Sequence, residues 1–198
     1  MAITNGYASL SEVKASLRID DNIDDALIEL AIEAASREID QACERIFYQE
    51  ADATRYYVPR DSYVVEIDDL VSFTSLKTSS AADGVFDLTW GTADRQLEPL
   101  NGIVGGIPSP TTQIRAVGDY LFTIDGGEAT VEVQGTFGWS AIPTAIKQAT
   151  VILASRIFRR NDSPLGVAGF VDIGVIRVSR LDPDVEAMIM PFKKIRMA

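Results

Sequence analysis

The feature that most constrains this sequence is a stripe of apolar residues early in the chain. Its members recur at intervals of three or four residues and are Ile28, Ile32, Ala35, Ile39, Cys43 and Ile46. This spacing places them on one face of an α-helix, with acidic residues on the solvent side. It predicts a long helix over residues 24–47. Six such side chains gain on the order of 10 kcal/mol from burial, so the stripe requires an apolar partner.

A second stripe near the other end of the chain supplies that partner. Pro143 is tolerated at the first position of a helix, and Ile146, Ala149, Leu153 and Ile157 follow at helical spacing. The pattern predicts a helix over residues 143–160. We expect the two stripes to pack against each other, which makes the intervening chain an insertion between them.

Two shorter helices are predicted at the ends of the chain. Ser9 and Glu12 form a capping box before a helix over residues 10–17. Asp182 and Pro183 are a typical helix start, and Pro191 is expected to end that helix and leave a short tail. The segment 161–169 is rich in helix-breaking residues and is predicted to be a loop, followed by an extended arm or hairpin over residues 171–178.

Between the helices, the hydrophobic period changes to two and β-branched and aromatic residues increase. The predicted strands are 54–58, 63–67, 71–78, 85–90, 113–116, 120–124 and 129–137, with a long loop over residues 100–112. The fold class is therefore α+β: a helical base of two long packed helices and two short terminal helices, with an inserted antiparallel β region. The expected parts are an N-terminal helical part (1–53), the β region (54–140) and a C-terminal part (141–198), the helical parts forming one domain.

Composition excludes several classes of chemistry. The chain has no histidine and one cysteine, Cys43, among 198 residues. This excludes Ser-His-Asp and Cys-His nucleophile systems, histidine metal sites and an internal disulfide. A reducing compartment is expected. We also expect a soluble cytoplasmic chain, since the longest apolar run is far shorter than the roughly 20 residues that span a membrane.

Motifs that carry chemistry are incomplete. Asp20, Asn22 and Asp24 match the first three ligand positions of an EF-hand loop, but the later glycine and glutamate are missing, and helix capping explains them better. The glycines match neither a Walker loop nor a dinucleotide-binding motif. Cys43 is expected to be a core residue. We therefore predict no catalytic residue, no cofactor and no metal.

The charge of the chain is unevenly distributed. Residues 1–100 contain 8 basic and 20 acidic residues, whereas residues 101–198 contain 10 basic and 9 acidic ones. Such polarity suits head-to-tail self-association or an acidic partner, and it argues against tight nucleic-acid binding. The simpler alternative is ordinary surface charge, with the arginines at the end of helix 143–160 interacting with the helix dipole. The candidate partner-binding residues are Arg159, Arg160, Arg177, Arg180, Phe192, Lys193 and Lys194.

Two blocks of the sequence resemble known phage proteins. Residues 7–20 (YASLSEVKASLRID) and 24–35 (DDALIELAIEAA) resemble the start of gp6-like head-tail connector proteins of tailed phages. The segments IPTAIKQA, RRNDSPLG and RVSRLDPDV, which begin at residues 142, 159 and 177, are similar to head-to-tail adaptors of long-tailed phages of actinobacteria. Together the blocks cover about half of the chain, and the β region is larger than in compact members of the family.

The resemblance implies a structural, non-enzymatic adaptor at the junction of capsid and tail, assembled in the host cytoplasm. Its partners would be the portal protein, the tail-side connector (stopper) and further copies of itself in a ring of about twelve, with genomic DNA passing non-specifically through the lumen and no membrane contact. By resemblance, the docking segments are residues 161–180 and the tail from Asp182, with Arg159, Arg160, Arg177 and Arg180 supplying charge to acidic partner surfaces and Phe192 an apolar anchor.

Three alternatives stay open at this stage. The protein could be a stopper or tail-completion protein of the same neck. From a different class, the β region could be a ligand-binding or hydrolytic module that uses Asp68, Asp69 or Asp94. A DNA-binding regulator would show salt-sensitive duplex binding.

Overall fold

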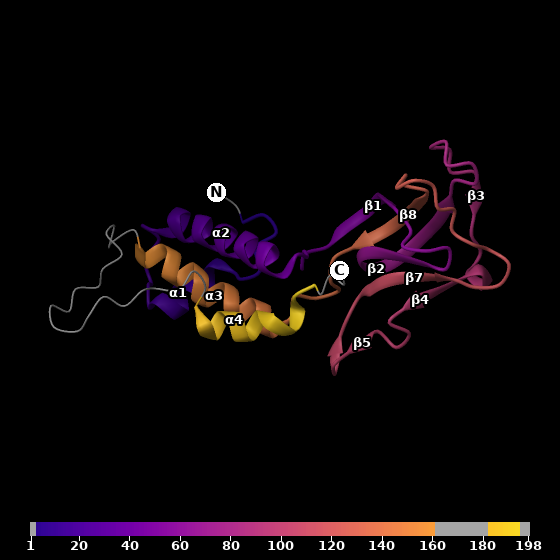
Figure 1. The fold of residues 1–198 in the computed structure, drawn as a ribbon. Helices are drawn as coiled ribbons and strands as arrows, with labels where there is room; N and C mark the ends of the chain where they lie inside the picture. Colours follow the sequence, from indigo (N-terminus) through magenta and orange to yellow (C-terminus); the bar gives the residue numbers. More distant parts are fainter. Residues whose placement is uncertain (1–2, 161–181, 195–198) are drawn as a thin grey trace. The chain divides into compact units, whose positions relative to one another are not determined.

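The computed structural model describes residues 3–160 and 182–194. The chain divides into two compact units, one comprising Met1–Phe47 and Ala141–Ala198 and the other comprising Tyr48–Ser140. The first unit contains the helices and the second an antiparallel sheet, so the predicted α+β class is confirmed (Figure 1). We call them the helical unit and the sheet unit.

The first helix, α1 (Leu10–Leu17), has the predicted bounds because a capping box fixes its start. The Ser9 hydroxyl accepts from the Glu12 backbone N–H at 3.3 Å, and the Glu12 carboxylate accepts from the Ser9 N–H at 2.8 Å. Lys147 of α3 (Thr144–Arg159) donates to the same carboxylate at 3.0 Å. The hydrogen bonds donated to the carboxylate, that of the Ser9 N–H first and that of Lys147 second, lower the pKa of Glu12 to about 2.

Replacing this carboxylate is expected to change the acid stability of the helical unit. Because the pKa of Glu12 is lowered from 4.5 to about 2, its stabilisation is complete above pH 4.5 and is lost as the pH falls towards 2. We expect Glu12→Gln to lower the free energy of unfolding by about 1 kcal/mol or less near pH 7. We also expect the stability of this variant to fall less than that of wild type as the pH is lowered. Urea unfolding between pH 7 and 2.5 measures both effects, and an unchanged pH profile would contradict the assignment.

The two long helices pack together as the stripes predict. Along α2 (Asp25–Cys43), Ile28, Ile32 and Ile39 are fully buried, and along α3 so is Ile146. The two helices are in contact with each other, and α1 touches both of them. The apolar stripes therefore form the core of the helical unit.

The predicted end of the long helix is wrong by four residues. Helix α2 ends at Cys43, and Glu44 takes a left-handed conformation with φ of 53°. The N–H groups of Glu44 and Arg45 both donate to the carbonyl of Asp40, which closes the helix. Phe47 is then held in place because its N–H donates to the Tyr7 hydroxyl at 2.8 Å. No glycine marks this end, so the sequence pattern did not reveal it.

The C-terminal segment folds back onto the helical unit. Helix α4 (Pro183–Ile189) starts at Asp182, whose carboxylate accepts from the Asp184 N–H at 3.0 Å, and a 3-10 turn, Met190–Phe192, follows. Val185, Ile189 and Phe192 are buried. The start of this helix at Asp182–Pro183 is thus confirmed, whereas Pro191 lies within the turn that continues it.

The sheet unit has the strand order β1-β8-β2-β7-β4, with β3 on the end of β2, and every pairing is antiparallel. The strands are β1 (Glu50–Tyr57), β2 (Val64–Thr78), β3 (Leu88–Thr89), β4 (Arg95–Glu98), β7 (Thr111–Ala116) and β8 (Val131–Phe137). Strand β2 is central because its first part pairs with β7 and its second part with β8.

Several strand predictions differ from the structure. The two strands predicted at 63–67 and 71–78 are one strand, β2, in which register shifts around Leu70 replace the predicted break. The predicted strand at 120–124 is absent, and β4 was not predicted. The predicted loop 100–112 contains a small hairpin of β5 (Ile103–Val104) and β6 (Ile107–Pro108), which turns at Gly105 and Gly106 with positive φ.

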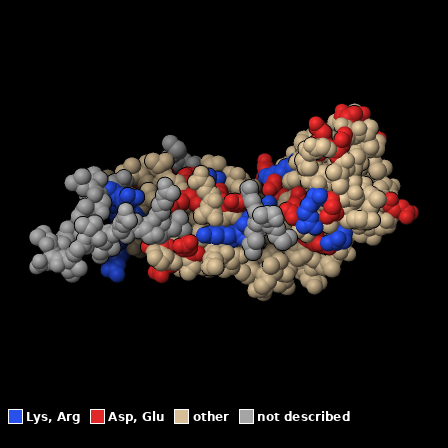
Figure 2. Space-filling view, viewed as in Figure 1, with Lys and Arg blue, Asp and Glu red and all other residues tan. Residues whose placement is uncertain are grey.

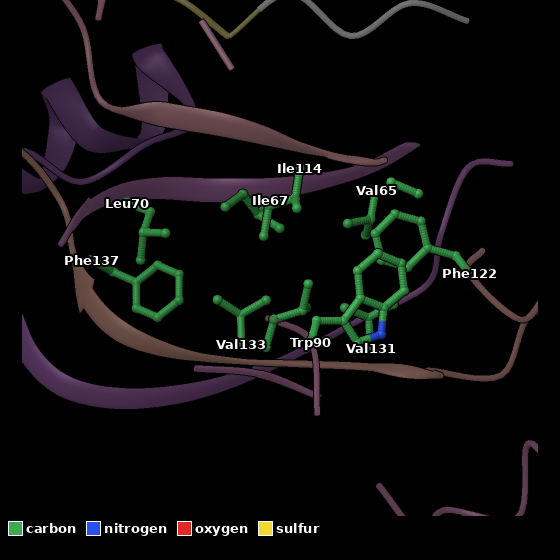
Figure 3. Packing of buried hydrophobic residues seen from close by; sticks show 11 residues of the cluster. Val65, Ile67, Leu70, Trp90, Ile114, Phe122, Val131, Val133 and Phe137 are labelled. Atoms are coloured by element: carbon green, nitrogen blue, oxygen red, sulfur yellow. The ribbon is translucent and has the colours of Figure 1, made fainter. Parts of the chain in front are cut away.

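The core of the sheet unit is a cluster of buried aliphatic and aromatic side chains (Figure 3). Trp90 stacks on Phe122 with ring centroids 4.6 Å apart, and its indole N–H donates to the Thr78 hydroxyl at 2.8 Å. Phe122 thus contributes to the core although its segment is not a strand. Alternating strand residues, such as Val131, Val133 and Phe137 of β8, supply most of the remainder.

Candidate functional site

The acidic residues considered for hydrolysis have structural roles. The Asp68 carboxylate accepts from Arg55 at 2.7 Å and from the Tyr57 hydroxyl at 3.3 Å. Asp69, its neighbour, is buried and accepts from the indole N–H of Trp139 at 2.8 Å. Asp94 accepts from the Gly91 N–H at 2.7 Å and closes a 3-10 turn. This use of the three carboxylates gives no support to a hydrolytic site.

Cys43 is buried in the helical unit. Its side chain is 0% exposed, and burial raises the pKa of the thiol to about 11. A thiol is a poor nucleophile under these conditions, since the thiolate is the reactive form. The structure thus places Cys43 in the core.

The acidic turn before α2 is occupied by a lysine. The ammonium of Lys14 lies 2.6 Å from the Asp25 carboxylate and 3.1 Å from the Asn22 side-chain oxygen, and it also donates to the carbonyl of Asp21. Of the three residues in the partial EF-hand pattern, Asn22 is therefore bound by a cation of the protein itself. Within residues 3–160 and 182–194, no group of three Asp, Glu, Cys or His side chains is arranged to hold a metal ion.

An open hollow of about 410 Å³ lies beside the start of α1. It is lined by the N-terminal segment, the first turn of α1 and the start of α3. Three ionisable residues line it: Tyr7, Glu12 and Lys147. Glu12 and Lys147 form an ion pair with each other. Such a hollow offers little to a small ligand, because binding sites need converging polar groups. Among the described helices, none is long and apolar enough to cross a bilayer.

Basic residues gather where α3 ends. Arg159 and Arg160 are exposed there, and Arg156 lies 3.5 Å from Asp182. Exposed Arg18, at the end of α1, belongs to the same end of the helical unit, since Ser16 and Ser155 are within 3.3 Å. Lys and Arg atoms are visible at this end in Figure 2. We call Arg18, Arg159 and Arg160 the arginine end.

The remaining predicted partner-binding residues differ in their placement. Lys193 lies 3.5 Å from Glu186, and the Lys194 N–H donates to the Cys43 carbonyl at 2.9 Å, so both lie near the C-terminal end of α2. Phe192 is only 5% exposed and meets Phe47 edge-on at 5.9 Å. It anchors the tail to its own unit, so the expectation that it is presented to a partner does not hold. Arg177 and Arg180 lie outside the described residues.

The sequence reasoning missed an apolar surface on α2. Ile23, Leu27 and Leu30 are 85%, 47% and 58% exposed, and Ala34 is also exposed. Leu27, Leu30 and Ala34 follow at intervals of three and four residues, which places them on one side of α2, and Ile23 lies just before the helix begins. We call these four residues the α2 stripe. The second stripe was visible in the sequence, but the acidic residues between its members suggested a wholly polar outer face.

Comparison with known proteins finds one family that matches part of the chain. Residues 7–74, from the segment before α1 to the middle of β2, match the phage gp6-like head-tail connector protein family. No curated protein matches the sequence.

Solved structures share the fold over the whole chain. A chain from the neck of an empty gene transfer agent particle, computed with C6 symmetry, superposes with a TM-score of 0.61 at 20% identity, covering 100% of this chain and 95% of that one. A chain from the neck of the native particle, computed with C12 symmetry, gives 0.60 at 18% identity, covering 100% and 94%. A chain from the virion of the native particle gives 0.55 at 22%, covering 100% and 95%. The family match is confined to residues 7–74, and the solved structures show that this chain shares their fold along its length.

Proposed function

We propose that this protein is a structural head-to-tail adaptor in the neck of a tailed phage or phage-like particle. It forms a ring, of about twelve copies, between the portal and a tail-side connector, and DNA passes through the lumen. The observation that carries the proposal is the full-length likeness to neck chains of a gene transfer agent together with the connector match at residues 7–74.

The chemistry of the described residues is consistent with this role. The carboxylates of Asp68 and Asp69 bind Arg55 and Trp139, and Cys43 is buried in the core. In the acidic turn before α2, Lys14 pairs with Asp25. The net charge of −11 weakens adhesion to DNA, because nucleic-acid affinity comes mainly from Lys and Arg that neutralise phosphates. A wall of this charge would let DNA slide through a channel.

The two basic ends of the helical unit are proposed as contacts with acidic protein surfaces of the neck. The arginine end lies near the start of α2 and the Lys193–Lys194 pair near its end. A helix of 19 residues separates them by about 28 Å. Arg177 and Arg180 are proposed to add to this charge. One protomer can therefore present basic groups to two different neighbours.

The experiment is electron microscopy and pull-down with the portal protein of the same particle. Deleting the tail is unsuitable, because Val185, Ile189 and Phe192 belong to the core of the helical unit. We expect wild type to form rings on the portal, and Lys193→Glu with Lys194→Glu to weaken binding about tenfold through lost charge complementarity.

The control is Lys77→Glu, a charge reversal on the sheet unit, where Lys77 pairs with Glu132 at 3.3 Å. It should bind the portal as wild type does. Rings that attach to the tail-side connector but not to the portal would reassign the protein as a stopper or tail-completion protein. Absence of binding to any neck component would overturn the proposal.

A further inference from the structure

The α2 stripe is an apolar surface on the side of α2 opposite its buried face. The buried face is formed by Ile28, Ile32 and Ile39, whereas Leu27 and Leu30 are about half exposed and Ile23 is 85% exposed. At 100° per residue, Leu27, Leu30 and Ala34 are centred roughly 140° around the helix axis from the buried isoleucines. A helix that is apolar on opposite sides is typical of one covered on both. Residues 3–160 and 182–194 cover only the side that carries the isoleucines.

The charge around the α2 stripe indicates what covers it. Residues 19–34 contain six acidic and no basic residues. One of these acids, Asp25, pairs with Lys14. If the stripe packed against the same stripe of another copy, as in a two-fold dimer, two acidic segments would face each other, which is unfavourable. A basic surface is the complementary one.

The arginine end is such a surface on the same chain. Residues 155–160 contain three arginines and no acid, and Arg18 adds a fourth. On α3, Gln148, Ile152 and Arg159 follow at intervals of four and seven residues, on one side of the helix; Gln148 and Arg159 are exposed and Ile152 is partly exposed. This outward face of α3 therefore combines an apolar residue, Ile152, with arginine charge. Its positive charge is complementary to the acidic residues around the α2 stripe, and Ile152 offers an apolar contact to the leucines of the stripe.

The two surfaces lie at the same end of the helical unit but on different sides of it. Lys14 of α1 pairs with Asp25 at the start of α2, and Ser16 of α1 touches Ser155 near the end of α3. Since α2 and α3 bury facing stripes, their outward faces point away from each other. A contact that joins these two faces between copies is head-to-tail, and a head-to-tail contact closes into a ring when its rotation allows.

We infer that the α2 stripe of one protomer packs against the outward face of α3 and the arginine end of the next protomer. The inference rests on the proposed function, because it identifies the lateral contact within the proposed ring. It assigns Arg18, Arg159 and Arg160 to the neighbouring copy and leaves Lys193 and Lys194 for a different neck protein.

Paired cysteines test the contact directly. Leu30→Cys and Ile152→Cys are combined in the full chain, where Cys43 is fully buried. They are oxidised with diamide both in concentrated solution and in rings assembled on the portal. We expect a ladder of covalent multimers from the double variant and only monomers from each single variant. Dimers from Leu30→Cys alone would show a two-fold contact and overturn the inference, as would a double variant that stays monomeric in both preparations.

A second measurement uses polar substitutions of the same exposed leucines. Leu27→Ser with Leu30→Ser should weaken self-association about tenfold or more, since apolar centres dominate interfaces. Val85→Ser, on the sheet unit and 60% exposed, is the control. Raising the salt concentration should weaken association of wild type. Unchanged association of the leucine variant would contradict the inference. Binding of single protomers to the portal is measured separately, so a lost lateral contact is distinguishable from a wrong function.

Discussion

Gly138→Ala is expected to unfold the sheet unit or to cost it about 3 kcal/mol or more in stability. Gly138 has φ of +105°, and a Cβ there would overlap the Tyr48 carbonyl oxygen and lie 2.8 Å from its carbon. Both are backbone atoms that cannot rotate away. The Gly138 N–H also donates to the Asp69 carbonyl at 2.7 Å, which holds the glycine in this position. Both tryptophans, Trp90 and Trp139, belong to the sheet unit, so their fluorescence in urea reports its unfolding.

The matched control for Gly138 is Gly127→Ala. Gly127 has a similar φ of +99°, but no atom would lie within 4 Å of an added Cβ. We expect a cost of about 1–2 kcal/mol, from backbone strain alone. Similar losses in the two variants would show that close approach to Tyr48 contributes nothing.

Phe47→Ala is expected to destabilise the helical unit by about 3–5 kcal/mol. The Phe47 ring is 0% exposed and lies between Tyr7 and Phe192, at centroid distances of 5.7 and 5.9 Å. Its removal leaves a cavity where the N-terminal segment, the end of α2 and the tail meet. We therefore expect faster amide hydrogen exchange throughout α4.

Phe47→Leu is the control for this cavity, because it keeps most of the volume and is expected to cost less, about 1–2 kcal/mol. Tryptophan fluorescence supplies an internal check. If the two units unfold independently, the fluorescence transition stays near that of wild type while the exchange in α4 increases. If Phe47→Ala leaves the amide hydrogen exchange of α4 unchanged, the packing of α4 on the helical unit does not depend on the Phe47 ring.

The helices could be predicted because their signals are local. The capping box at Ser9 and Glu12 sets the start of α1, and the apolar spacing sets the faces of α2 and α3. The end of α2 could not be predicted, since it depends on a glutamate, Glu44, in the left-handed conformation and on a hydrogen bond to distant Tyr7. Such contacts join residues far apart in the sequence.

The sheet was predicted less completely because strand pairing is non-local. Strand β4 has a mixed pattern and is recognised only by its pairing with β7. Phe122, in contrast, has the hydrophobicity of a strand residue, but it fills the core from a non-strand segment whose N–H donates to the Ser62 carbonyl at 2.9 Å. Hydrophobicity thus predicted burial correctly and backbone conformation incorrectly.

For the candidate surfaces, too, local features could be predicted from the sequence and contacts between distant residues could not. The basic end of α3 was apparent from composition, and the structure places exposed Arg159 and Arg160 there. The burial of Phe192 was not apparent, because its partner Phe47 is distant in the sequence. The α2 stripe could have been found by examining both faces of the predicted helix for apolar spacing.

The insertion of the sheet unit has a consequence for biosynthesis. The helical unit is discontinuous, since the 93 residues from Tyr48 to Ser140 separate its two parts, whereas the sheet unit is continuous. At about 5–20 residues per second, a ribosome needs about 5–20 s to make that insertion. During this interval the nascent α2 lacks α3, and its isoleucines have no permanent cover. The sheet unit is therefore able to fold first, and the helical core is completed only when residues from Ala141 onward have emerged.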